Sequence, residues 1–366
     1  MCDRENAAMN PSADSMPDPI AWLLQPDNPS VRYLTLRHLI GKPEDDPEVR
    51  QTRADIHGSP IVKRIFARQS PEGCWGDPAS PYLPKYKATY WTLMILGFLG
   101  LSRDDERVRR AAEYVFTFQR PEGGFGERGP EGARREYDYI VERARKRGKE
   151  PPAEPEFIAD CLHQSVLSCL TGNVVAALLR LGYGDDPRVW RAIDWLASVQ
   201  NADGGWLCPY WKAHIRDRHG CFYGTICPLE AFAEIPENRR TPAVQGAAAR
   251  GAEFLLMHRL YKADHHDFRV ISEGFLTLSF PWFYGGSNIL RSLWILTKLG
   301  ICDERMDDAL AVLRSKRAPE GTWLLENSPS GRMQADLEKK GQPSKWVTLM
   351  ALQALSGIEP QRRKER

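Results

Sequence analysis

The stretch Gln200-Asn-Ala-Asp-Gly-Gly-Trp206 decides the fold of this chain, because related stretches recur along the sequence. They are Gln69-Ser-Pro-Glu-Gly-Cys-Trp75, Gln119-Arg-Pro-Glu-Gly-Gly-Phe125 and the more divergent Arg317-Ala-Pro-Glu-Gly-Thr-Trp323. Each follows an apolar run with helical spacing. The glycine takes a turn that a side chain would forbid, and the aromatic ring is expected to fold back over the end of the preceding helix. Four such turns predict a repeat architecture.

The segments between these turns carry helical patterns that come in pairs. First helices of a pair are expected near residues 31–40, 86–99, 171–181, 222–234, 284–299 and 344–355. Five second helices follow them, and the short Ile20–Leu24 segment could replace the missing sixth. With no strand pattern this is an all-α protein, whose pairs either stack into an open solenoid or close into a ring. A partnerless last helix and a short first one favour the ring, an α/α toroid of about six helix pairs.

Length, charge and cysteine content limit the classes of protein to which this chain can belong. The chain has 366 residues, a formal net charge of +2 and 8 cysteines spread along it. This charge balance argues against a nucleic-acid binder, and no apolar run reaches membrane-spanning length. Dispersed cysteines favour a reduced, cytoplasmic protein. We expect a disordered segment at 1–16, one toroid domain at 17–358 with an insertion at 128–168, and a basic tail at 359–366.

The four turns resemble the Gln-Trp repeats of squalene–hopene cyclases, and the helix pairs resemble the α/α toroid shared with the β subunits of protein prenyltransferases. The likeness runs from about Val31 to Leu355. It implies an inner ring of parallel helices, an outer antiparallel ring and a central cavity that often holds isoprenoid chains. Fold is much better specified by this likeness than function is.

Two departures limit what the resemblance implies about chemistry. Squalene cyclases protonate their substrate through an Asp-x-Asp-Asp motif, which this sequence lacks, and the chain is about one toroid long. Prenyltransferases bind zinc through Asp-x-Cys and a distant His, whereas here the nearest sequence is Asp160-Cys161-Leu162-His163. Neither set of catalytic residues can be transferred position by position.

Two segments interrupt the repeat, and such segments often carry function. The insertion at 128–168 is either a solvated loop with a charged helix over 134–147 or a lid over one mouth of the ring. Residues 326–345 form either another solvated loop or a polar site before the last helix, where Lys345 at the helix start could bind an anionic group. From this segment and the last inner pair come the catalytic candidates Asp336, Glu338, Lys345 and Tyr284.

Thiols and imidazoles make a candidate zinc site. The starts of successive inner helices and the turns before them share one end of the ring, which should bring Cys169, Cys208 and Cys221 together. His163 or His219 would supply a fourth ligand for tetrahedral zinc. The alternative is that the cysteines are small packing residues at helix contacts, since no Cys-x-x-Cys pair is present. His265-His266-Asp267 is expected to be a solvated turn.

Aromatic residues on or beside the inner helices are candidates for substrate contact through their π faces, or else simple core. They are Tyr90, Trp91, Trp282, Phe283, Tyr284, Trp294 and Trp346.

Three classes of function follow. The favoured one is an isoprenoid- or terpenoid-handling enzyme, cyclase-like or transferase-like, that holds a hydrophobic small molecule in the central cavity and makes peripheral contact with membranes. The second is a non-catalytic carrier of a terpenoid or other lipid in the same cavity, which would need no acid motif. The third is a toroid that serves as a protein-binding scaffold.

Overall fold

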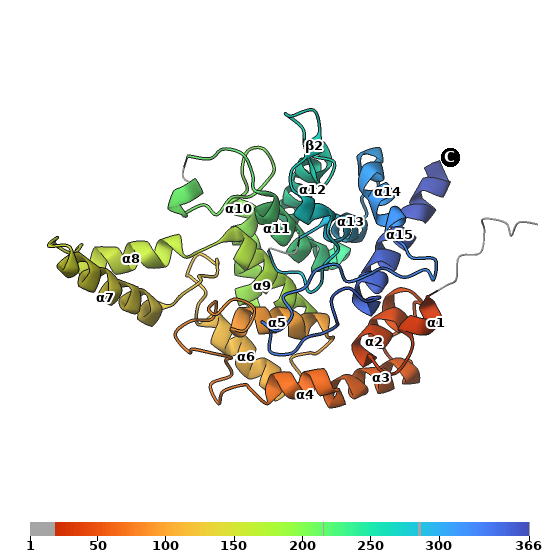
Figure 1. Ribbon diagram of the computed structural model, residues 1–366, viewed down its shortest axis with the longest axis horizontal. Helices are drawn as coiled ribbons and strands as arrows, with labels where there is room; N and C mark the ends of the chain where they lie inside the picture. The colour runs from red at the N-terminus through yellow and green to blue at the C-terminus, as the bar shows by residue number, and fades with distance from the viewer. Residues whose placement is uncertain (1–18, 215, 285–286, 366) are drawn as a thin grey trace, which may run out of the picture.

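The computed structural model describes residues 19–214, 216–284 and 287–365, and side chains up to residue 358. The disorder expected for residues 1–16 therefore lies outside the described residues. The described chain is helical, and its one sheet is a two-stranded hairpin of β1 (Lys262–Ala263) and β2 (Arg269–Val270). The all-α prediction is confirmed (Figure 1).

Six inner helices occupy the predicted segments. They are α2 (Pro29–His38), α5 (Thr89–Phe98), α9 (Ser168–Arg180), α11 (Phe222–Glu234), α13 (Ile289–Lys298) and α15 (Lys345–Glu365). Every residue of α5 is buried. Close approach of neighbours requires glycine: a Cβ at Gly172 of α9 would lie 2.4 Å from the Cys227 carbonyl carbon of α11. Helix α15 continues well past residue 355, so it includes most of the segment expected as a basic tail.

Outer helices cover the inner ring. They are α3 (Pro47–Gly58), α4 (Pro60–Phe66), α6 (Glu106–Phe116), α10 (Pro187–Ser198), α12 (Pro242–Met257) and α14 (Asp307–Ser315). Most begin with a side-chain cap and a proline in the first turn, as Asp186 and Pro187 do for α10. Short pieces complete the chain: α1 (Ile20–Leu23), η1 (Lys212–His214), η2 (Glu237–Arg239), η3 (Glu273–Leu276) and η5 (Glu304–Met306).

Each repeated turn seals the end of its own outer helix. Trp206 is fully buried, and its Nε1 donates a hydrogen bond of 2.7 Å to the carbonyl of Leu196, ten residues earlier in α10. Trp75 and Trp323 make the same bond to carbonyls ten residues before them, and Phe125 is equally buried. The prediction that these rings cover helix ends is confirmed.

A threonine hydroxyl on the following inner helix accepts a hydrogen bond from each turn. The backbone N–H of Trp206 donates to Thr225 Oγ1 at 3.0 Å, and the equivalent acceptors elsewhere are Thr89, Thr171 and Thr348. The turn is thereby fixed to the next inner helix as well as to its own outer helix.

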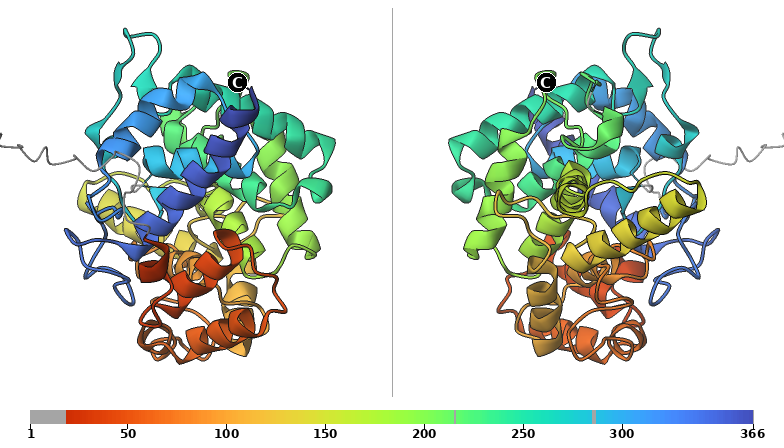
Figure 2. Two further views of the ribbon diagram at one scale, coloured as in Figure 1. Left: turned by 90° about the vertical axis from the view of Figure 1, so that its right-hand side faces the viewer. Right: turned by 90° about the vertical axis from the view of Figure 1, so that its left-hand side faces the viewer.

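The two ends of the series of helices meet. Helix α15 packs against α1 and α2 as well as α13, and Lys345 of α15 forms an ion pair with Asp27 beside α1 (Figures 1 and 2). An extended solenoid would separate the first and last helices, so that alternative does not describe this chain.

The insertion forms a helical hairpin of α7 (Pro130–Lys146) and α8 (Glu154–Gln164). The hairpin projects from one end of the ring in Figure 1 and lies in front of that end in the right-hand view of Figure 2. Only Ala133 of α7 is buried, and α8 has no buried residue. The first helix matches the expectation over 134–147, whereas the second falls in a stretch expected to be a loop. Pro155 lies in the first turn of α8, and Pro151 and Pro152 lie before it, where a helix tolerates proline.

Candidate functional site

The segment before α13 carries its aromatic side chains into the interior of the ring. Phe280 stacks on Trp346 of α15 with a centroid distance of 4.7 Å and meets Phe98 of α5 edge-on at 5.1 Å. Trp282 packs on Trp294 of α13 at 5.4 Å. All five side chains are at most 6% exposed, so these rings fill most of the interior, although Phe98 and Trp294 also border a pocket.

A second group of rings lies at the start of α5, and we call it the aromatic mouth: Tyr82, Tyr86, Trp91, Phe283 and Tyr284. Trp91 is its centre, with centroid distances of 5.0 to 5.4 Å to the other four rings. The indole N–H of Trp91 donates to the Tyr82 carbonyl at 2.6 Å. Trp91 is therefore fixed in position, while Tyr284 remains partly exposed.

One carboxyl group lies at this mouth. Glu127 lies two residues after Phe125 of the second repeated turn, and its backbone N–H donates to the Ser165 carbonyl of the insertion at 3.0 Å. Burial raises the pKa of Glu127, although Arg128 and the Tyr82 hydroxyl act in the opposite direction. A carboxyl with a raised pKa holds its proton more readily than an exposed glutamate does. Sequence reasoning missed Glu127, because a single glutamate after a turn has no distinguishing pattern.

The Tyr82 hydroxyl of the mouth interacts with this carboxyl. Tyr82 and Tyr284 stack with a centroid distance of 6.2 Å, and the pKa of Tyr82 is raised by burial while the Tyr284 hydroxyl acts in the opposite direction. Tyr284 Oη is buried and meets no hydrogen-bond partner with standard geometry among the described residues. A pocket of about 210 Å³ opens beside Tyr82 and Glu127, with Arg128 and Gly132 on the insertion side. Tyr82 and Glu127 are the groups through which this pocket meets the aromatic mouth and the carboxyl beside it.

Two of the three predicted zinc thiols converge next to this mouth. Cys169 Sγ lies 3.9 Å from Cys208 Sγ, and the charge of a Cys169 thiolate would act on Tyr284. The hydrogen bond between the two thiols raises the pKa of Cys169 and lowers that of Cys208. Cys221 acts electrostatically on Cys169, and Cys208 acts on Cys221. Among the described residues, however, these thiols do not form a set of three ligand atoms within 4.8 Å.

The ring contacts of the two predicted histidine ligands are with other side chains than this thiol pair. His163 packs on Tyr210 with a centroid distance of 4.0 Å, and the ring of His219 lies parallel to that of His258 with a centroid distance of 5.2 Å. The zinc site at the thiols stays a prediction.

The other predicted catalytic residues hold the start of α15. Glu338 accepts a hydrogen bond from the backbone N–H of Lys345 at 2.7 Å and one from Ser344 Oγ. Burial raises the pKa of Glu338. Lys345 forms its ion pair with Asp27, and Asp336 accepts from the Gly331 N–H at 2.8 Å. Each of these groups therefore has a structural partner, and none belongs to the aromatic mouth as defined above. Tyr90, the remaining predicted aromatic contact, is fully buried and donates to the Gly126 carbonyl at 2.9 Å.

A buried ion network crosses the interior between α9, α11 and α13. Arg291 of α13 is fully buried and contacts Glu230 Oε2 of α11 at 2.5 Å and Asn173 Oδ1 of α9 at 2.7 Å. Its Nη1 donates to the Phe283 carbonyl and to Ser287 Oγ, both at 2.8 Å. Arg291 thus connects the aromatic mouth to two inner helices. Sequence reasoning missed it, because a lone arginine on an apolar helix does not reveal its partners.

The same network continues to the surface. Arg180 of α9 contacts Glu230 and Glu234 of α11, and Lys298 of α13 contacts Glu234 Oε2 at 2.6 Å. These groups border a pocket of about 210 Å³ to which all six inner helices contribute. Because every charge here has an opposite partner, we interpret this end of the ring as structural.

Comparison with known proteins agrees with the resemblance seen in the repeats. No family model matches the chain. It is 28% identical over 192 residues to the squalene–hopene cyclase of Bradyrhizobium diazoefficiens, which is 50% of this chain and 25% of that protein. The match thus spans about a quarter of the length of this relative.

Solved structures that resemble the chain have low identity to it. A protein from Actinoplanes is 16% identical, with 92% of this chain and 89% of that one covered and a TM-score of 0.43. A variant of the type II terpene cyclase MstE from Scytonema, in complex with geranylgeranyl dihydroxybenzoate, is 18% identical, with coverage of 91% and 88% and the same TM-score. Among the described residues, no helix has both the length and the apolar character needed to cross a bilayer.

Proposed function

We propose that this chain is a terpenoid-handling enzyme that binds an isoprenoid at the aromatic mouth and protonates it from Glu127. The observation that carries the proposal is the juxtaposition of the partly buried Glu127 carboxyl group with Tyr82, whose ring packs on those of Trp91 and Tyr284. The similarity to a squalene–hopene cyclase supports the choice of substrate class.

The chemistry follows from these groups. A protonated Glu127 transfers its proton to one carbon of a substrate double bond, and the π electrons of that bond form the new C–H bond. The other carbon becomes cationic, and a neighbouring double bond can attack it to close a ring. The π faces of Trp91 and Tyr284 stabilise such a cation. Loss of a proton from the final cation to the Glu127 carboxylate regenerates the acid.

Access to the mouth involves the insertion. The pocket beside Glu127 has Gly132 and Arg135 of α7 among its lining residues, so this helix forms part of its wall. A pocket of about 210 Å³ is small for a polyisoprenoid chain. Binding a long chain therefore requires the α7–α8 hairpin or the rings of the mouth to move, in agreement with a lid role for the insertion.

The test uses all-trans farnesol and squalene as probes. We expect native mass spectrometry of the full chain to show one bound isoprenoid, and extraction after incubation to yield a cyclised product. Glu127→Gln keeps the shape of the side chain but cannot act as the acid, so product should fall at least 100-fold while binding persists. Glu131→Gln, on the exposed face of α7, is the matched control.

The results separate the three classes of function. Binding of the probes without any product identifies a carrier. If neither probe binds, the isoprenoid proposal is wrong and a protein-binding scaffold becomes the better explanation.

A further inference from the structure

The repeat fails at one place, after α12. Every other outer helix from α4 onward ends in the Gln-x-x-x-Gly-x-aromatic turn or its divergent copy, whereas α12 ends in the β1–β2 hairpin. Arg259 and Lys262 of this segment reach Asp308 of α14 at 3.2 and 2.6 Å, so they take over the connection to the next outer helix. The fold is thus preserved, which leaves the other polar residues of the segment without a role in the repeat.

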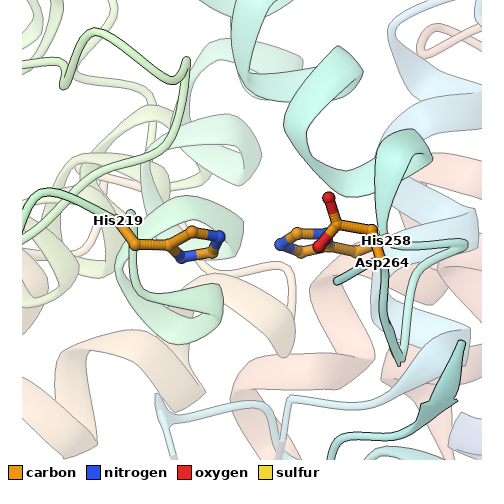
Figure 3. Close-up of side chains that lie close together, drawn as sticks. All are labelled: His219, His258 and Asp264. Atoms are coloured by element: carbon orange, nitrogen blue, oxygen red, sulfur yellow. The ribbon is translucent and has the colours of Figure 1, made fainter. Parts of the chain in front are cut away.

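Three of the nearby polar side chains converge. His219 precedes α11, His258 ends α12 and Asp264 belongs to the hairpin, and one ligand atom from each lies within 4.8 Å of the other two. Figure 3 shows the two imidazole rings pointing toward each other, with the Asp264 carboxylate beside the ring of His258. Among the described residues this is the single group of three metal-ligating side chains that meets this distance.

The buried member has an unsatisfied nitrogen. His258 is 2% exposed, and its Nδ1 lacks a hydrogen bond although Asp264 Oδ1 is 3.3 Å away. Two ligands that bind one tetrahedral zinc at about 2.0–2.1 Å are themselves about 3.3 Å apart. The separation of these two atoms therefore fits two ligands of one ion better than it fits a hydrogen bond.

His219 and Asp264 each have a second polar contact, as metal ligands usually do. His219 Nδ1 lies 2.9 Å from the Gly220 carbonyl, a contact that leaves Nε2 available for an ion. Gly220 in turn donates to Asp203 of the third repeated turn at 2.6 Å, so that turn positions the loop of His219. The second oxygen of Asp264 lies 3.3 Å from His265 Nε2.

The geometry points to a divalent transition-metal site, of the zinc class, formed by His219, His258 and Asp264. Two imidazoles and one carboxylate suit zinc, and three protein ligands leave one position for water or an oxyanion. That position faces solvent, because His219 is exposed while Phe222 and Phe254 pack around His258. The site differs from the predicted thiol site in two of its three ligands, and shares only His219 with it. It does not depend on the proposed function.

The experiment measures zinc and cobalt binding to the metal-free full chain. We expect one zinc ion per chain by calorimetry, and a cobalt complex whose spectrum has no thiolate charge-transfer band. His219→Ala and Asp264→Asn should each weaken zinc binding at least tenfold. His266→Ala, an exposed neighbour outside the group, should bind as the unmodified chain does.

Several results would overturn the site. They are no zinc binding by the unmodified chain, equal affinity in all three variants, and a cobalt–thiolate band or loss of binding in Cys208→Ser. Circular dichroism and the thermal midpoint of each metal-free variant show whether it folds. If Asp264→Asn does not fold, His219→Ala decides alone, because that side chain is exposed on a loop.

Discussion

The side chain of Gln200 bridges two outer helices, since its Nε2 donates to the carbonyl of Gly204 at 2.7 Å and to that of Ala247 in α12 at 2.9 Å. Its Oε1 accepts from Arg250 at 2.9 Å. Gln69 and Gln119 make the same pair of bonds at their own turns. The recurring glutamine therefore connects successive repeats, which explains why the sequence repeats it.

Gln200→Ala should lower the free energy of unfolding by about 2 kcal/mol, because two carbonyl groups are left without this donor and Arg250 loses its acceptor. Urea unfolding followed by circular dichroism measures the change. Gln245→Ala, an exposed glutamine on α12, is the control and should change stability by less than about 0.5 kcal/mol. Equal effects of the two substitutions would contradict the bridging role.

Trp206→Phe should cost about 2–3 kcal/mol of stability, because the phenyl ring leaves a cavity and the Leu196 carbonyl loses its donor. Phe125 shows that a repeat can be built with phenylalanine at this position, so the variant should still fold. Trp211→Phe is the matched control, since Trp211 is 46% exposed. A variant with unchanged stability but altered ligand binding would identify Trp206 as a site residue instead.

Gly172→Ala should destabilise the protein by about 3 kcal/mol, since the new methyl group would overlap the backbone of Cys227 and force α9 and α11 apart. The thermal midpoint is the measurement. Gly58→Ala is the control, because a Cβ there meets no heavy atom within 4 Å. If both variants melt alike, the two helices are not in the close contact described above.

Acid should weaken the ion network. Burial would raise the pKa of Glu234, but Arg180 and Lys298 outweigh it and lower that pKa from 4.5 to about 2. A depressed pKa stabilises the folded state fully above pH 4.5, and this contribution is lost as the pH falls from about 4.5 to about 2. We therefore expect urea midpoints of the unmodified chain to fall across that window.

Glu234→Gln tests whether the Glu234 carboxyl group accounts for this loss of stability in acid. The variant should be less stable at pH 7, because Lys298 loses its partner, and its stability should depend less on pH between about 5 and 2. Glu237→Gln is the control, since Glu237 is exposed in η2. An identical pH dependence in the two variants would mean that other carboxyl groups account for acid unfolding.

The helices of the toroid could be predicted because their signals are local. The apolar spacing of α10, the Asp186 cap and the glycine after the last turn all lie within a few residues of the structure they specify. The thiol pair Cys169 and Cys208 could be anticipated as well, because a repeat architecture places helix starts and turns at one end. The packing of aromatic rings in the interior could not be predicted, because the sequence around Phe280 and Trp282 does not distinguish a packed ring from one that lines a cavity.

The sequence by itself determined the repeat, the positions of the inner helices and the turns that join them, because each of these depends on residues close together in the chain. Only the tertiary structure decided which side chains meet across the ring. Arg291 joins Glu230, Glu127 joins the rings around Trp91, and His258 joins His219 and Asp264. His258 was not singled out from the sequence, and His265-His266-Asp267 was assigned to a solvated turn just beyond Asp264. Such contacts depend on how the helices are arranged in space, and a local pattern contains no information about partners that lie dozens of residues away.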